Sequence, residues 1–140
     1  MNRRGVEMIA NGKWGLVAAG MLVMAAAVPA TESGIPQALP EGVTEEMVEE
    51  GRALFASDAL CFTCHATGEG VPNLGPNLTD DTWLNIEDPT SYDQFVELIN
   101  TGVPMPKEHM IPMVPRAGSP INDEQVRAVA AFVWTLANGS

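Results

Sequence analysis

The 140-residue chain is poor in cysteine and in basic residues. It has two cysteines, and they are separated by only two residues, so a disulfide between them would close almost no loop and add little stability. Seven Lys and Arg residues stand against 18 Asp and Glu, which gives a formal net charge of −11 at pH 7. A surface this acidic repels nucleic acid and anionic lipid, so the composition argues against nucleic-acid binding.

The sequence also lacks the patterns of β-structure and of repeat proteins. No stretch alternates apolar and polar residues with the period of a strand, and no internal repeat or low-complexity tract is present. The length fits one domain, since domains usually contain about 100–200 residues. We therefore look for a single helical core.

The first thirty residues have the pattern of an export signal. Arg3, Arg4 and Lys13 precede a continuous apolar run, Trp14–Val28, and the small residue Ala30 stands before the change to polar sequence. We predict cleavage after Ala30 and a protein that is periplasmic or otherwise exported. If the leader stays uncleaved, it anchors the protein to the membrane, although the run is slightly shorter than the about 20 residues that a spanning helix needs.

After the leader, the chain divides into a flexible tether, residues 31–43, and one domain, residues 44–140. The tether is punctuated by Pro and Gly and has no apolar period. Without the leader, which contains three bases and one acid, four bases and 17 acids remain, so the formal charge of the mature chain is −13. This charge favours solubility or a partner with a basic surface.

Three segments have the apolar period of amphipathic helices: residues 44–57, 91–102 and 122–138. The expected caps are Thr44 for the first helix, a Ser91–Gln94 capping box and Gly102 for the second, and Asn122 for the third. Two long loops rich in Pro, Gly and Asn, residues 66–90 and 103–121, separate them. Loops of this length in a compact domain usually have a function, and here they suggest a chain folded round a cofactor.

Both cysteines lie in one short motif, Cys61-Phe-Thr-Cys64-His65. Cys-x-x-Cys-His is the attachment pattern of c-type haem. On one helical turn, the two thiols reach the two vinyl groups of a porphyrin and form thioethers, while His65 is carried under the ring to ligate the iron. We therefore predict one haem c, attached through Cys61 and Cys64.

Three other uses of the two thiols compete with haem attachment. A structural disulfide does not need the adjacent histidine, and a zinc site lacks the second pair of ligands that the usual spacings supply. A thioredoxin-like redox pair needs a βαβ setting, which the sequence does not provide.

The segment from Thr44 to Leu136 resembles the class I cytochrome c family. In that family a helical Gly-x-x-x-Phe precedes the haem motif, and Gly51 and Phe55 match it here. The resemblance implies that the first and last helices cross closely at Gly51, with Val129 and Phe132 at the contact. It also implies the small all-α cytochrome c fold, with about three main helices and long loops wrapped round one covalently bound haem.

The family has a Gly-Pro-x-Leu segment after the haem motif, which Gly75 to Leu78 match. The resemblance implies that the Pro76 carbonyl accepts the Nδ1 hydrogen of His65, which fixes the ring and raises its basicity as a ligand. The alternative is that Gly75 and Pro76 only form a turn.

The resemblance also implies a methionine on the second face of the iron. Met113 has the family's spacing, ten residues before Asp123 at the start of the last helix. Met105, His109 and Met110 remain alternatives. A neutral thioether favours Fe(II), so a methionine ligand raises the reduction potential, whereas His109 would lower it.

Three aromatic residues are of interest besides the motif. Trp83 and Tyr92 are expected in the core, and the alternative is that they donate hydrogen bonds to a haem propionate. Trp134, on the last predicted helix, is expected to be partly exposed.

With both axial positions filled by the protein, the iron has no open site for a substrate. We therefore predict that the chain is not an enzyme but a monomeric one-electron carrier, moving between a donor and an acceptor redox protein of the exported compartment. At least one of these partners should carry a basic docking patch. The alternatives are a haem subunit of a larger dehydrogenase or oxidase complex and a gas-binding haem sensor.

Overall fold

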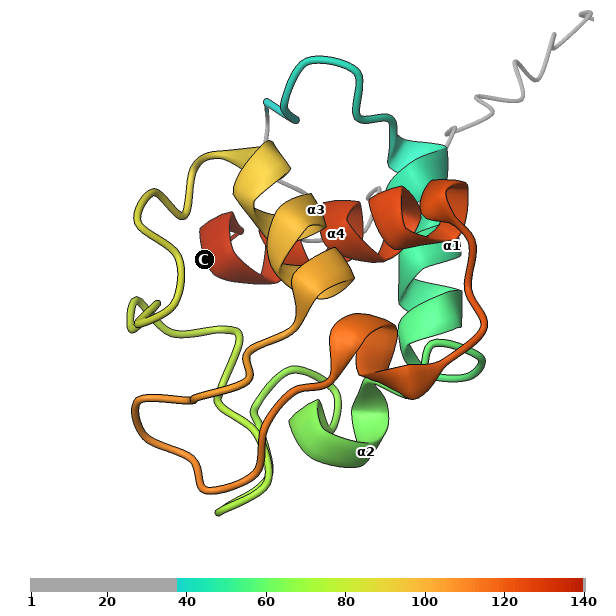
Figure 1. The fold of residues 1–140 in the computed structure, drawn as a ribbon. Coiled ribbons are helices and arrows are strands. Elements are labelled where there is room, and N and C mark those ends of the chain that lie inside the picture. The colour runs from blue at the N-terminus through green and yellow to red at the C-terminus, as the bar shows by residue number, and fades with distance from the viewer. Residues whose placement is uncertain (1–37, 140) are drawn as a thin grey trace, which may run out of the picture. The chain divides into compact units, whose positions relative to one another are not determined.

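A computed structural model describes residues 38–139, which are helical and have long connections (Figure 1). The elements are α1 (Glu45–Phe55), α2 (Phe62–His65), α3 (Tyr92–Thr101), the 3-10 turn η1 (Pro115–Gly118) and α4 (Asp123–Asn138). Within this range β-pairing is limited to two isolated bridges, Val71 with Gly75 and Val103 with Met113. The predicted all-α class and the three main helices are confirmed.

The predicted leader, residues 1–30, and most of the predicted tether lie outside the described residues, so their assignment stays a prediction. Among the helices of residues 38–139, none combines the length and the apolar character that crossing a bilayer requires.

The caps of α1 and α4 follow the local sequence. The Thr44 hydroxyl accepts a hydrogen bond from the Met47 amide at 3.3 Å and begins α1. At α4, the Asn122 side chain accepts from the Gln125 amide at 2.9 Å, and the Gln125 side chain accepts from the Asn122 amide at 3.0 Å. This reciprocal pair satisfies two donors that a helix start leaves without partners.

The capping box predicted at the start of α3 is wrong. The Ser91 side chain makes no capping hydrogen bond. The Gln94 side-chain oxygen instead accepts from the backbone amides of Glu87 and Asp88, at 2.9 and 3.2 Å, because the preceding loop folds back over the first turn of the helix. At the other end, Gly102 adopts φ 71° and closes α3 as predicted.

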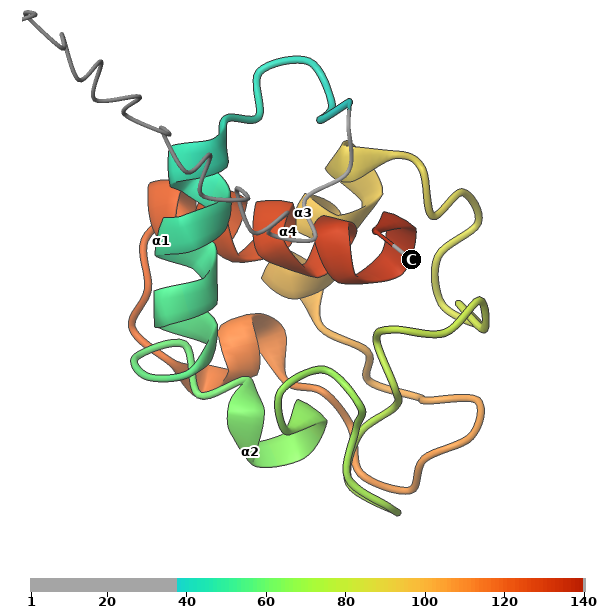
Figure 2. The same ribbon diagram turned by 180° about the vertical axis from the view of Figure 1, so that it is seen from behind.

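The helices α1 and α4 approach closely at Gly51, and both views show the crossing (Figures 1 and 2). A Cβ atom on Gly51 would overlap the Ala128 carbonyl oxygen and lie 3.0 Å from Cβ of Phe132. Phe55 packs on Phe132 edge to face, with ring centroids 5.3 Å apart. The crossing at Gly51 therefore has the form that the family resemblance implies, and Val129 is buried beside it.

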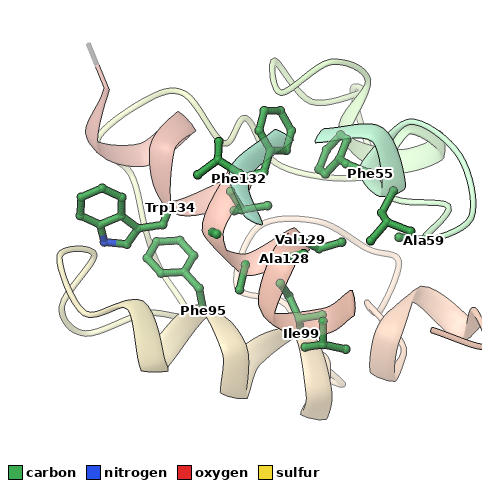
Figure 3. Packing of buried hydrophobic residues seen from close by; sticks show 14 of the residues in the cluster. Phe55, Ala59, Phe95, Ile99, Ala128, Val129, Phe132 and Trp134 are labelled. Atoms are coloured by element: carbon green, nitrogen blue, oxygen red, sulfur yellow. The ribbon is translucent and has the colours of Figure 1, made fainter. Parts of the chain in front are cut away.

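The core continues from this crossing to α3, whose Phe95 and Ile99 face α4 (Figure 3). Trp134 joins this core with only 7% of its surface exposed, so the expected partial exposure is wrong. Its indole nitrogen donates to the Thr90 carbonyl at 2.9 Å, and this bond satisfies the one polar group that would otherwise favour the surface.

The side chains of Trp83 and Tyr92 also donate hydrogen bonds to the protein backbone. The indole of Trp83 donates to the Asp80 carbonyl at 3.0 Å and packs edge to face on Phe95. The Tyr92 hydroxyl donates to the Arg127 carbonyl at 2.8 Å and connects α3 to α4. The predicted core position therefore describes both residues better than the alternative, in which they donate hydrogen bonds to a haem propionate.

Replacing Gly51 with alanine should destabilise the fold by about 1–3 kcal/mol, because the added methyl group meets backbone atoms that cannot move aside. Urea unfolding of the haem-containing protein, followed by far-UV circular dichroism, measures the loss. The control is Glu50→Ala on the exposed face of the same helix, which should stay within about 0.5 kcal/mol of the wild type. An unchanged midpoint for Gly51→Ala would contradict the close crossing.

The pH dependence of stability should report on Tyr92. Burial raises the pKa of this phenol above its ordinary value of 10, so the folded state holds the proton more tightly than the unfolded state. The contribution of Tyr92 to stability is therefore complete below pH 10 and is lost as the pH rises through the folded pKa. Urea titrations at pH 8 and pH 11 should show a larger fall for the wild type than for Tyr92→Phe; equal falls would contradict this.

Candidate functional site

The motif Cys61 to His65 folds as a single helical turn. The amides of Cys64 and His65 both donate to the Cys61 carbonyl, at 3.1 and 3.0 Å, and α2 ends after His65 because Ala66 leaves the helical conformation. Residues three and four apart on a helix share one side. The two thiols and the imidazole accordingly line one cavity.

This cavity has a volume of about 300 Å³ and walls that are mostly apolar. It is bounded by α2, by both long loops, and by the sides of α3 and α4 that face them. In both views α2 and the loop before η1 lie on the same side of α4 (Figures 1 and 2). The buried core residues that also line the cavity are Phe55, Leu78, Ile86, Phe95, Ile99, Val129 and Val133.

The segment after α2 is pressed against the motif at Gly75. A Cβ atom on Gly75 would lie 2.6 Å from the Cys64 carbonyl oxygen and 3.0 Å from Cβ of Cys64, so a side chain does not fit there. This close approach brings the Pro76 carbonyl oxygen to 3.0 Å from Nδ1 of His65. With Nδ1 as the donor, the lone pair of the ring lies on Nε2, the nitrogen that can ligate a metal.

His65 is held in its neutral form. Burial lowers the pKa of His65, and the nearby His109 lowers it further, while the hydrogen bond to Pro76 acts in the opposite direction. A neutral imidazole is the form that binds iron, because the metal needs the ring's lone pair.

The cysteines do not match the competing uses. Both thiols are free, so the structure contains no disulfide between Cys61 and Cys64. Burial raises the pKa of the Cys61 thiol to about 11, whereas the pKa of a reactive thiol in a redox pair is lowered. Across residues 38–139, no group of three or more His, Cys, Asp and Glu residues could hold a metal ion.

Two of the four candidates for the second axial ligand line the cavity, and two do not. Met105 and Met110 are 84% and 85% exposed and do not line the cavity. Met113 and His109 both line it. The backbone of Met113 is fixed by two hydrogen bonds to Val103, at 2.7 and 3.1 Å, immediately after α3, so Met113 stands at the base of the loop that carries His109.

Three contacts of the site could not be read from the sequence. Lys107 donates to the Leu84 carbonyl and connects the two long loops at the cavity. Gly102 leaves room for the Met113 carbonyl, which a Cβ atom at that position would overlap. Arg116 bonds to both α3 and α4. The signal available for Lys107 and Arg116 was only their rarity, since the mature chain has four bases.

The residues present fit a haem of the c type. Two thiols and a neutral imidazole face an apolar cavity from one helical turn, and a thioether lines the same cavity from another segment. Soft and imidazole ligands around an apolar space suit haem iron and its ring.

Comparison with known proteins agrees with this fit. The family described as "Cytochrome C oxidase, cbb3-type, subunit III" matches residues 46–133. The chain is 32% identical over 96 residues to the cbb3-type cytochrome c oxidase subunit FixP of Sinorhizobium medicae (strain WSM419), covering 66% of this chain and 29% of the relative. It is 30% identical over 98 residues to the subunit CcoP of Rubrivivax gelatinosus, covering 69% and 28%. The chain thus spans less than a third of these relatives, and no solved structure matches it.

Replacing Gly75 with alanine should displace Pro76 and weaken its hydrogen bond to His65. We expect a loss of about 1–3 kcal/mol of folding stability and a lower fraction of purified protein with covalently attached haem, measured by intact mass. Gly139→Ala, at the end of α4 and with φ −100°, is the matched control and should behave as the wild type. Full haem attachment and unchanged stability in Gly75→Ala would contradict the close packing on Cys64.

Proposed function

The chain belongs to the family described as cytochrome c oxidase, cbb3-type, subunit III, and from this premise we propose that it is an electron-transfer subunit of a larger oxidase complex. It is a c-type cytochrome, and its one haem c is attached through Cys61 and Cys64. When bound, the haem supplies a centre that takes up and releases one electron.

One observation carries the proposal: both cysteines, His65 and Met113 line a single apolar cavity. We assign His65 and Met113 as the two axial ligands. Pro76 orients the imidazole through its carbonyl, and the apolar walls exclude water from the space between the ligands. Fixed ligands in low-dielectric surroundings would keep the geometry of the site similar in the oxidised and reduced states. Fast electron exchange needs this similarity.

Membership of a complex is better supported than a freely diffusing carrier. The relatives are named as subunits of a cbb3-type oxidase, and this favours the complex-subunit alternative over the predicted free shuttle. The chain itself would pass electrons and carry out no reaction on a substrate, since side chains supply both axial ligands. The gas-sensor alternative gains no support from the relatives, which are named as oxidase subunits.

The remaining expectations concern location and partners. Residues 1–30 are proposed as the export leader or membrane anchor, 31–43 as a tether and 44–140 as the haem domain. The described residues contain 16 acids and four bases, so a docking partner should offer a basic patch, and association should slow as salt rises.

Replacing Met113 with alanine should abolish the low-spin spectrum and lower the reduction potential by roughly 0.1–0.3 V, since axial ligands set haem potentials over a range of about 0.8 V. Spectroelectrochemical titration of the haem-containing protein measures both. Met105→Ala and Met110→Ala are the matched controls and should leave spectrum and potential unchanged, because both side chains are exposed. The same loss in His109→Ala, with Met113→Ala unaffected, would transfer the ligand role to His109.

Capture from detergent-solubilised membranes of the producing organism tests the place in a complex. The full chain, tagged at its C-terminus, should elute in fixed proportion with oxidase activity at every dilution. Elution at the mass of one chain, without oxidase activity, would return the assignment to a free carrier. The intact mass of the captured chain also shows whether the leader is cut after Ala30.

A further inference from the structure

The side chain of Arg116 connects three parts of the chain. Its Nε donates to the Asn100 side-chain oxygen near the end of α3 at 2.9 Å, and Nη1 donates to the Ile121 carbonyl at 2.7 Å. Its Nη2 donates to the carboxylate of Asp123, the first residue of α4. Hydrogen bonds with a charged donor are stronger than neutral ones, and the planar guanidinium fixes all three directions together. The bonds to Asn100 and Ile121 are partly buried, whereas the bond to Asp123, whose side chain is 84% exposed, lies at the surface.

The backbone at Arg116 adopts a left-handed conformation, which is unfavourable for a residue with a side chain. Arg116 has φ 53° and ψ 29°, and Ala117 has φ 53° and ψ 21°, so two successive residues with side chains adopt the left-handed region before Gly118. Such residues persist only where the surrounding contacts determine them. The three bonds of the guanidinium supply part of those contacts, and the amide and hydroxyl of Ser119 add two more by donating to the Arg116 carbonyl.

This turn begins two residues after Met113, and a second set of contacts holds Met113 from the other side. The Met113 amide and carbonyl bond to Val103, which lies three residues after Asn100. Residues 100–103, at the end of α3 and just after it, therefore contact the segment 113–116 at two points. Val103 bonds to the backbone of Met113, and Asn100 bonds to the side chain of Arg116. If the Arg116 contacts were lost, Met113 would be fixed on one side only.

We propose that Arg116 is a positioning residue that holds Met113 against the iron, an inference that rests on the proposed ligation by Met113. The guanidinium does not touch the cofactor in this role. It maintains the left-handed turn at residues 116–118 and so restricts the movement of the segment that carries the thioether.

The test is the affinity of the oxidised haem-containing protein for added imidazole, which competes with the sixth ligand. Arg116→Ala should bind imidazole roughly ten- to hundredfold more tightly, because a network of charged hydrogen bonds no longer opposes opening of the Met113 segment. The visible absorption of thioether-bound Fe(III) should weaken in parallel. Arg116→Lys keeps the positive charge but lacks the planar guanidinium, so it should give an intermediate affinity for imidazole.

Two control variants separate positioning from general destabilisation. Tyr92→Phe loses a hydrogen bond between α3 and α4, and Arg127→Ala removes an exposed arginine of α4. Both should keep the imidazole affinity within about twofold of the wild type. If Arg116→Ala yields no folded protein, Asn100→Ala and Asp123→Ala each remove one partner of the guanidinium and should raise the affinity by a smaller factor.

The outcomes separate the two proposals. Loss of the thioether absorption in Met113→Ala together with tighter imidazole binding in Arg116→Ala supports both. A wild-type protein without this absorption would overturn the ligation by Met113, and the role of Arg116 with it. A wild type with the absorption, but with unchanged imidazole affinity in Arg116→Ala, would overturn the role of Arg116 alone.

Discussion

The structure depends on the absence of a side chain at residue 51. Because Gly51 lets α1 rest on the backbone of α4 at Ala128, the edge-to-face contact of Phe55 and Phe132 can form directly behind it. This contact fixes the end of α1, and only five residues separate that end from the turn that carries the two thiols and His65. A helix crossing outside the haem motif thereby determines where the attachment turn can lie.

The features that the sequence predicts correctly depend on few neighbouring residues. Thr44, Asn122 and Gly102 cap their helices because a cap needs only the adjacent turn. The haem motif is of the same kind, since two thiols and an imidazole on one turn suffice to identify it. Such local geometry can therefore be predicted without knowing how the rest of the chain packs.

The failures occur where distant segments compete for the same group. Gln94 was expected to cap its own helix, but two backbone amides of the preceding loop take its oxygen. Trp134 is buried because the Thr90 carbonyl, 44 residues away, accepts its proton. The Arg116 network likewise joins residues 100, 116, 121 and 123, and no period or motif marks such a set. These arrangements follow from the packed structure and could not be derived one segment at a time.

The packing of α1 on α4 has a consequence for the order of folding. The core joins residues 48–55 to residues 126–133, so it cannot form until almost the whole chain has been synthesised. Residues 61–65 emerge well before that point, while α4 is still absent. During this interval the two thiols are open to the attachment of haem, and the closing of α4 on α1 then completes the walls of the cavity around it.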